Sequence, residues 1–162
     1  MRSEAILQGD TMHQIYEFNQ IIPIDRQKIM NVLDKDTFII NHFNMLEKIE
    51  YLTDDKRTEG TKFKVSLHLK RKIFRFKSEI TEYDAPRSFS ITTFTRHGNI
   101  ITKLNLVDHH EGSQIQVNSL INNTQKSARL ILKIMQPIIK LGLDRSIHNF
   151  ILEIQKDSVS ND

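Results

Sequence analysis

Apolar and polar residues alternate along most of the chain between residues 61 and 121. Within residues 61–69, for example, Phe63 and Val65 fall on one face of an extended chain, and Lys62 and Lys64 fall on the other. A period of two is typical of β-strands that bury one face and expose the other. The pattern predicts strands at residues 61–69, 73–83, 88–95, 100–108 and 113–121, separated by short polar turns.

Two more strands are predicted nearer the N-terminus. Residues 15–22 are rich in β-branched and aromatic residues, which favour strands, and residues 46–52 follow a similar pattern. Pro23 ends the first of these strands, because proline lacks the backbone N–H that strand pairing needs. The chain therefore places one strand before, and one after, a stretch of a different character.

That stretch, between the two strands, predicts two short helices. Asp25 is a suitable N-cap for a helix over Arg26–Leu33, and a second helix is predicted over Asp36–His42. We expect Asp34 or Asp36 to cap the second helix, since a carboxylate can accept from the free N–H groups of a first turn.

After residue 124 the period lengthens to about 3.6, which predicts a helix over residues 125–155. Its C-terminal half is amphipathic, with Leu143, Ile147 and Phe150 recurring at three- and four-residue steps. Its first half is apolar almost all round, which indicates burial on more than one side. Pro137 is expected to kink the helix or to begin a second segment.

The order of elements predicts an antiparallel α+β domain, because strands follow one another in one run and helices lie at the ends. A length of 162 residues suits one domain. We expect residues 1–12 to form a flexible leader, 13–156 the domain, and 157–162 a polar tail.

Composition excludes several kinds of protein. The chain has no cysteine, which excludes disulfides, thiolate zinc sites and cysteine nucleophiles. Its net charge of +3 is mild, and acidic residues are interspersed, so we expect no nucleic-acid partner. No secretory signal and no apolar run of about 20 residues occur, so we expect a cytoplasmic protein without stable membrane insertion.

Several short segments resemble the START-like (SRPBCC) superfamily, over roughly residues 14–156. They are Ile-Pro-Ile-Asp at 22–25, Gly-Thr at 60–61, Ile-Thr-Glu-Tyr-Asp-Ala-Pro-Arg at 80–87, and Glu-Gly-Ser at 111–113. The aromatic residue usual in the first short helix is absent from 28–31, which read Lys-Ile-Met-Asn. The resemblance implies a helix-grip fold, in which a curved antiparallel sheet of about seven strands wraps around the long C-terminal helix and leaves an apolar cavity.

In that fold, the inward face of the sheet and one stripe of the long helix would line the cavity. Each residue singly is also explained by a filled core. Four hydroxyls fall on the same face, and they would bond a ligand, neighbouring carbonyls or water. The candidate ligand-binding residues are Phe63, Val65, Leu67, Phe74, Phe76, Ser78, Ile80, Phe89, Ile91, Thr93, Thr102, Leu104, Leu106, Ile115, Val117, Ser119, Ile131, Met135 and Ile138.

No metal site or cofactor is expected. His109 and His110 are adjacent in a predicted strand end, where side chains alternate between faces and make poor paired ligands. No G-x-S-x-G motif or Gly-rich loop is present, so the catalytic residues of any enzyme stay unknown. A lone cavity group would be the remaining route to catalysis, and the candidates are Arg145, Asp144, Glu82 and His42.

The most basic segment, Lys70 to Lys77, is interpreted as a solvated sheet face, with contact to an anionic membrane or RNA as the alternative. Three functions stay open. The first is binding or carriage of a small hydrophobic molecule such as a lipid, isoprenoid or polycyclic compound. The alternatives are a polyketide cyclase or dehydratase-type enzyme, and a stress- or chaperone-linked interaction protein. We expect a monomer or weak dimer.

Overall fold

The computed structural model describes residues 12–122 and 126–160. In the last helix it describes the backbone throughout, but not the side chains at 126–132, 134–135, 138–139 and 158–160. The elements are β1 (His13–Ile22), α2 (Arg26–Leu33), α3 (Asp36–His42), β2 (Leu46–Tyr51), β3 (Lys62–Leu69), β4 (Lys72–Asp84), β5 (Ser88–Thr95), β6 (Gly98–His109), β7 (Gly112–Ile121) and α4 (Lys126–Ser160).

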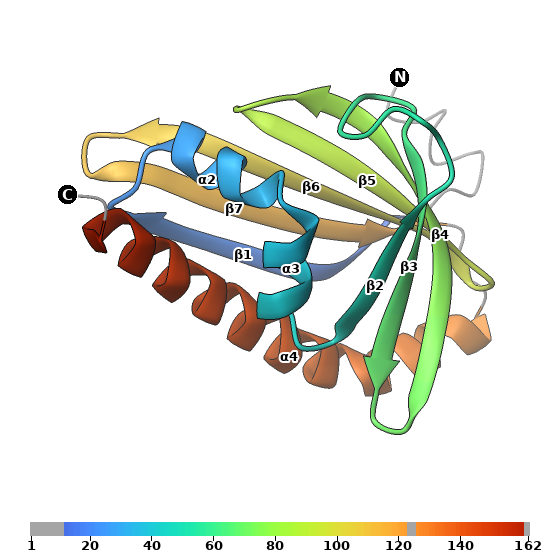
Figure 1. Ribbon diagram of the computed structural model, residues 1–162. Helices are drawn as coiled ribbons and strands as arrows, with labels where there is room; N and C mark the ends of the chain where they lie inside the picture. The colour runs from blue at the N-terminus through green and yellow to red at the C-terminus, as the bar shows by residue number, and fades with distance from the viewer. Residues whose placement is uncertain (1–11, 123–125, 161–162) are drawn as a thin grey trace, which may run out of the picture.

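The seven strands form one antiparallel sheet in the order β1-β7-β6-β5-β4-β3-β2. Strands β2 to β7 follow one another as a meander, whereas β1 and β2 lie at opposite edges although only two short helices separate them in sequence. Helices α2 and α3 therefore span from one edge to the other, and the sheet curves around α4 (Figure 1). This arrangement confirms the predicted α+β helix-grip architecture.

The predicted bounds of α2, α3 and β5 agree with the structure to the residue, and the other strands differ by one or two residues at their ends. The cap of α2 is the expected one, since Asp25 Oδ1 accepts from the backbone N–H of Lys28 over 3.0 Å. The predicted cap of α3 is wrong. Its N-cap residue is Lys35, without a side-chain bond, because both neighbouring aspartates accept from residues of the sheet and its loops.

Helix α4 runs without interruption through Pro137, so no second segment begins there. It also continues to Ser160, past the predicted end of the domain at residue 156. No helix in the described part of the chain is both long enough and apolar enough to cross a bilayer.

The core lies where the C-terminal half of α4 packs against the sheet and α2. Ile147, Phe150, Ile151 and Ile154 of α4 are buried there. Ile29 and Met30 of α2, Tyr16 of β1, and Leu106 and Ile115 of the central strands pack against them. The apolar stripe that the sequence predicted for this half of α4 is therefore the stripe that meets the sheet.

Candidate functional site

A cavity of about 350 Å³ lies between the inner face of the sheet and the three helices α2, α3 and α4. Its described lining is mostly apolar, and the only charged side chains in it are Asp34 and Arg57. Ten of the residues predicted for a ligand cavity line this space. They are Phe63, Val65, Ile80, Phe89, Ile91, Thr102, Leu104, Ile115, Val117 and Ser119.

The other predicted residues lie elsewhere. Leu106 is fully buried in the core, and Leu67, Phe74 and Phe76 lie toward the turn between β3 and β4, where they are not among the described lining residues. Alternation along a strand predicts which face a side chain is on, but not how far along that face the cavity extends. The side chains of Ile131, Met135 and Ile138 lie outside the described residues.

The four predicted hydroxyls pair with one another across neighbouring strands. Ser78 Oγ and Thr93 Oγ1 are 2.9 Å apart, and Thr102 Oγ1 and Ser119 Oγ are 2.8 Å apart. Two hydroxyls have two O–H donors, and the bond between them uses one. The Thr102–Ser119 pair, which lines the cavity, can therefore still donate one hydrogen bond into it.

Sequence reasoning did not place the two short helices or β2 in the site. Ile29, Met30 and Leu33 of α2 and Ile39 of α3 line the cavity from the side opposite the sheet. Their helical spacing carried the signal, because one apolar stripe of a short helix must face something. The remaining lining residues that were not predicted as site residues are Tyr16, Asp34, Phe43, Leu46, Ile49, Tyr51, Arg57, Tyr83, Leu143, Ile147 and Phe150.

A small polar cluster forms one part of the lining, at the turn between α2 and α3. We call Asp34, Asp36, Tyr51, Arg57 and Tyr83 the polar rim. The Tyr51 hydroxyl donates to Asp36 Oδ1 over 2.9 Å, and Arg57 Nη2 forms an ion pair with the same oxygen. The Tyr83 hydroxyl donates to Asp34 Oδ1 over 3.3 Å. Two carboxylates and one guanidinium thus meet beside an apolar space.

The electrostatics of the rim keep its tyrosines protonated. Burial raises the pKa of Tyr51 to about 12, and the bond to Asp36 adds to the shift while the charge of Arg57 opposes it. Burial, followed by the charge and hydrogen bond of Asp34, also raises the pKa of Tyr83. Both hydroxyls are therefore donors at neutral pH, and neither is suited to act as a base.

The third tyrosine lies at another part of the cavity. Tyr16 of β1 is buried, and its hydroxyl donates to Asp144 Oδ1 of α4 over 2.7 Å. Burial, and then the hydrogen bond to Asp144, raise the pKa of Tyr16. The Asp144 carboxylate therefore holds α4 to the first strand, and Asp144 itself is not among the described lining residues.

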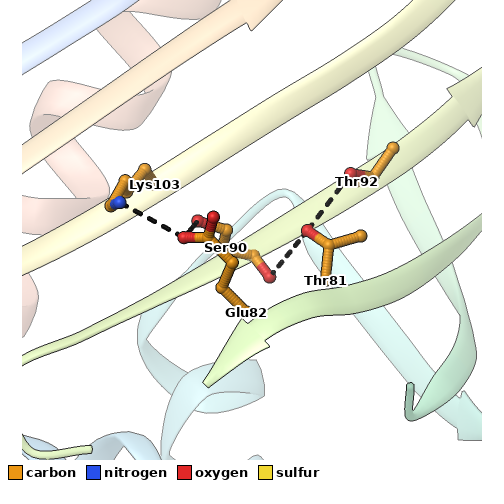
Figure 2. Close-up of polar contacts among 5 residues, drawn as sticks. All are labelled: Thr81, Glu82, Ser90, Thr92 and Lys103. Carbon is orange, nitrogen blue, oxygen red and sulfur yellow. Dashed lines mark hydrogen bonds and ion pairs between the residues drawn. The ribbon is translucent and has the colours of Figure 1, made fainter. Parts of the chain in front are cut away.

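The other candidate catalytic groups also lie away from the cavity. Arg145 is exposed, and His42 stacks on Phe38 with its Nδ1 2.8 Å from the Phe38 carbonyl oxygen. Glu82 lies on the outer face of the sheet, where it accepts from Ser90 Oγ over 3.1 Å and pairs with Lys103 Nζ over 3.2 Å (Figure 2). The bond to Lys103, followed by the bond to Ser90, lowers the pKa of Glu82.

The two adjacent histidines at the β6–β7 turn lie closer together than alternation implies. The ring centroids of His109 and His110 are 4.1 Å apart, because β6 ends at His109 and His110 belongs to the turn. One ligand atom from each, together with one from Glu111, lies within 4.8 Å of the others. The Glu111 backbone N–H already donates to His109 Nδ1, and the three side chains lie at the surface or near it.

No protein-family model matches the sequence, and no curated protein matches it significantly. Solved structures share its fold. Ara h 8.0201 has a TM-score of 0.70 and 18% identity, over 90% of this chain and 99% of that one. Norcoclaurine synthase from Thalictrum flavum, in complex with dopamine and hydroxybenzaldehyde, has a TM-score of 0.69 and 12% identity, over 93% and 90%.

A third similar structure is the di-domain ARO/CYC StfQ from the steffimycin biosynthetic pathway, with a TM-score of 0.74 and 7% identity. The match covers 97% of this chain and 55% of StfQ. At such identities the agreement concerns the fold alone. The chain has the helix-grip fold of the START-like (SRPBCC) superfamily, as its residues predicted.

Proposed function

We propose that the protein binds and carries a small, largely apolar molecule in the cavity between the sheet and α4. The observation that carries the proposal is the cavity itself, whose volume of about 350 Å³ lies within the range of small-molecule sites. Ligand sites are mostly apolar clefts with a few placed polar groups. The lining, with its aliphatic and aromatic majority and its polar rim, agrees with that description.

Burial of apolar area would supply most of the affinity, at about 25 cal/mol per Å². The polar rim would then decide the orientation. Asp34 accepts one long bond from Tyr83, so its carboxylate has room to accept from a ligand hydroxyl or amine. The ligand would lie with its apolar body against Val117 and Leu104 and with its polar end at the rim.

Native mass spectrometry of the protein as purified tests the proposal, followed by denaturing analysis of whatever is released. The expected result is a near-stoichiometric apolar molecule, which extraction into organic solvent would identify by class. A clean apo mass, together with no uptake of a panel of apolar molecules added in excess, would contradict carriage.

A second candidate is an enzyme of polyketide cyclase or dehydratase type. It is favoured by Asp34, the only carboxylate among the described lining residues, which lies at the edge of the cavity beside two protonated phenols. A carboxylate so placed could act as a general base. Asp34→Asn separates the two candidates, because a carrier would retain its ligand with at most a modest loss of affinity. An enzyme would bind and lose turnover by about 100-fold or more.

A further inference from the structure

The positive charge of the protein is concentrated in one hairpin. Residues 62–77, which we call the basic hairpin, comprise β3, its turn and the start of β4. They contain seven Lys and Arg and no Asp or Glu. The whole chain has 23 Lys and Arg against 20 Asp and Glu, so the other residues have 16 against 20 and carry a formal charge of −4. A mild net charge of +3 therefore conceals a strong asymmetry.

None of these seven cations forms an ion pair within the described part of the chain. Cations elsewhere do. Lys103, on the same outer face of the sheet, pairs with Glu82 in the network that Figure 2 shows. Arg26 likewise pairs with Asp108. The protein thus compensates cations at other places on its surface and leaves the basic hairpin uncompensated.

Two of the cations face each other directly. Lys64 of β3 and Lys77 of β4 are cross-strand partners on the outer face, since the next pair, Phe63 and Ser78, is buried on the inner face. Like charges directly opposite each other destabilise a sheet. A repulsive pair that is left without a counter-charge is relieved when an anionic partner covers it.

Apolar side chains are exposed among these cations. Ile73 is 46% exposed and Phe94 is 43% exposed, and both lie on the outer face, Phe94 as the partner of Lys77. Phe74, next in the chain, is 39% exposed. Exposed apolar residues that gather on one surface mark an interaction site more often than scattered ones do. The hairpin turn extends past α4 at the lower edge of Figure 1, which leaves it accessible.

We propose that the basic hairpin docks the protein on an anionic lipid bilayer. Lys and Arg near such a surface are attracted to its headgroups, and adjacent apolar side chains enter the boundary between headgroups and acyl chains. A single-stranded nucleic acid fits less well, because it needs a series of stacking aromatics and the outer face of the hairpin region offers Phe94 alone. The inference concerns the outer face of the sheet and stands whether or not the cavity carries a ligand.

Vesicle flotation tests the proposal with the full chain. The protein is mixed with vesicles of phosphatidylcholine alone, or of phosphatidylcholine and phosphatidylserine in equal parts, and the bound fraction is measured. We expect binding to the anionic vesicles only, with weakening as salt is added, because salt screens surface charge. Equal binding to both vesicles, or to neither at low salt, would overturn the proposal.

Matched variants locate the surface. Lys64→Gln with Lys77→Gln removes two charges from the hairpin, and Lys28→Gln with Lys35→Gln removes two exposed charges from the α2 region. We expect about a 25-fold loss of partitioning for the first variant, at about fivefold per charge, and little loss for the second. Equal losses would show an effect of net charge alone and would overturn the assignment to the hairpin.

Two further measurements guard the result. The first variant removes a repulsive pair, so its thermal midpoint should not fall, and a loss of binding then reports on the surface rather than on folding. Ile73→Ser with Phe94→Ser should weaken partitioning about tenfold or more while leaving the salt dependence unchanged. Complete displacement from vesicles by polyuridylate at equal phosphate concentration would assign the surface to nucleic acid and reject the bilayer.

Discussion

The hydroxyl of Tyr16 in β1 donates a hydrogen bond of 2.7 Å to Oδ1 of Asp144 in α4. The chain has three tyrosines, and the other two, Tyr51 and Tyr83, also line the cavity and donate to aspartates. Each phenol thus presents its ring to the cavity and its hydroxyl to a carboxylate. Phenols suit this position because they combine apolar surface with one polar end.

Removal of the Tyr16 hydroxyl is expected to loosen the attachment of α4. Tyr16→Phe should lower the free energy of unfolding by about 1.5 kcal/mol, because a hydrogen bond to a charged acceptor is stronger than a neutral one. Urea denaturation measures the loss. Asp144→Asn keeps an acceptor and removes the charge, so it should lose roughly half as much. A Tyr16→Phe variant as stable as the wild type would show that water replaces the bond without cost.

Alkaline pH is expected to destabilise the protein through the same tyrosines. Unfolded tyrosine ionises near its ordinary pKa of about 10, whereas the pKa of folded Tyr51 is about 12. Above about pH 10 the unfolded chain therefore binds fewer protons than the folded chain, and stability falls as pH rises.

Unfolding by urea at about pH 9 and at about pH 11 measures this loss, and absorbance titration of the folded protein follows the phenols directly. Tyr51→Phe is the matched control, because lysines also titrate in this range and only the difference between the two proteins reports on Tyr51. A folded-state titration near the ordinary value would contradict the burial of these phenols.

Filling the cavity is expected to exclude an apolar ligand. Val117→Phe adds a ring to a lining position of β7, and should reduce the uptake of a neutral apolar fluorophore such as Nile red by about tenfold or more. Val107→Phe is the matched control, since Val107 lies on the neighbouring strand and is 44% exposed. If both variants bound the dye as the wild type does, the dye would not occupy this cavity.

The fully buried core is expected to respond differently from exposed apolar positions. Leu106→Ala should cost about 2–5 kcal/mol, because Leu106 is 1% exposed and its removal leaves a void beside α4. Leu152→Ala, on the exposed side of α4, should change stability by about 0.5 kcal/mol or less. Chemical denaturation of both variants checks this, and equal costs would argue against the packing described for α4.

Local patterns in the sequence determined the elements and the faces of this protein. The alternation around Phe63 and Val65 predicted β3 and its inward side, and Asp25 marked the start of α2, because both signals act within a few residues of the chain. The change of period after residue 124 predicted α4 in the same way. Pro137 shows the limit of such signals, since the helix continues where a local rule expects a break.

Only the tertiary structure decided where the cavity ends and which groups meet in it. Leu67 and Ile80 share the inward face of adjacent strands, yet only Ile80 is among the described residues that line the cavity. Tyr16 and Asp144 are 128 residues apart in sequence, and nothing local to either predicts their bond. The same is true of Lys64 and Lys77, whose opposition depends on the register of β3 against β4. Periodicity reports the direction of a side chain, whereas its neighbours depend on how distant segments are placed in space.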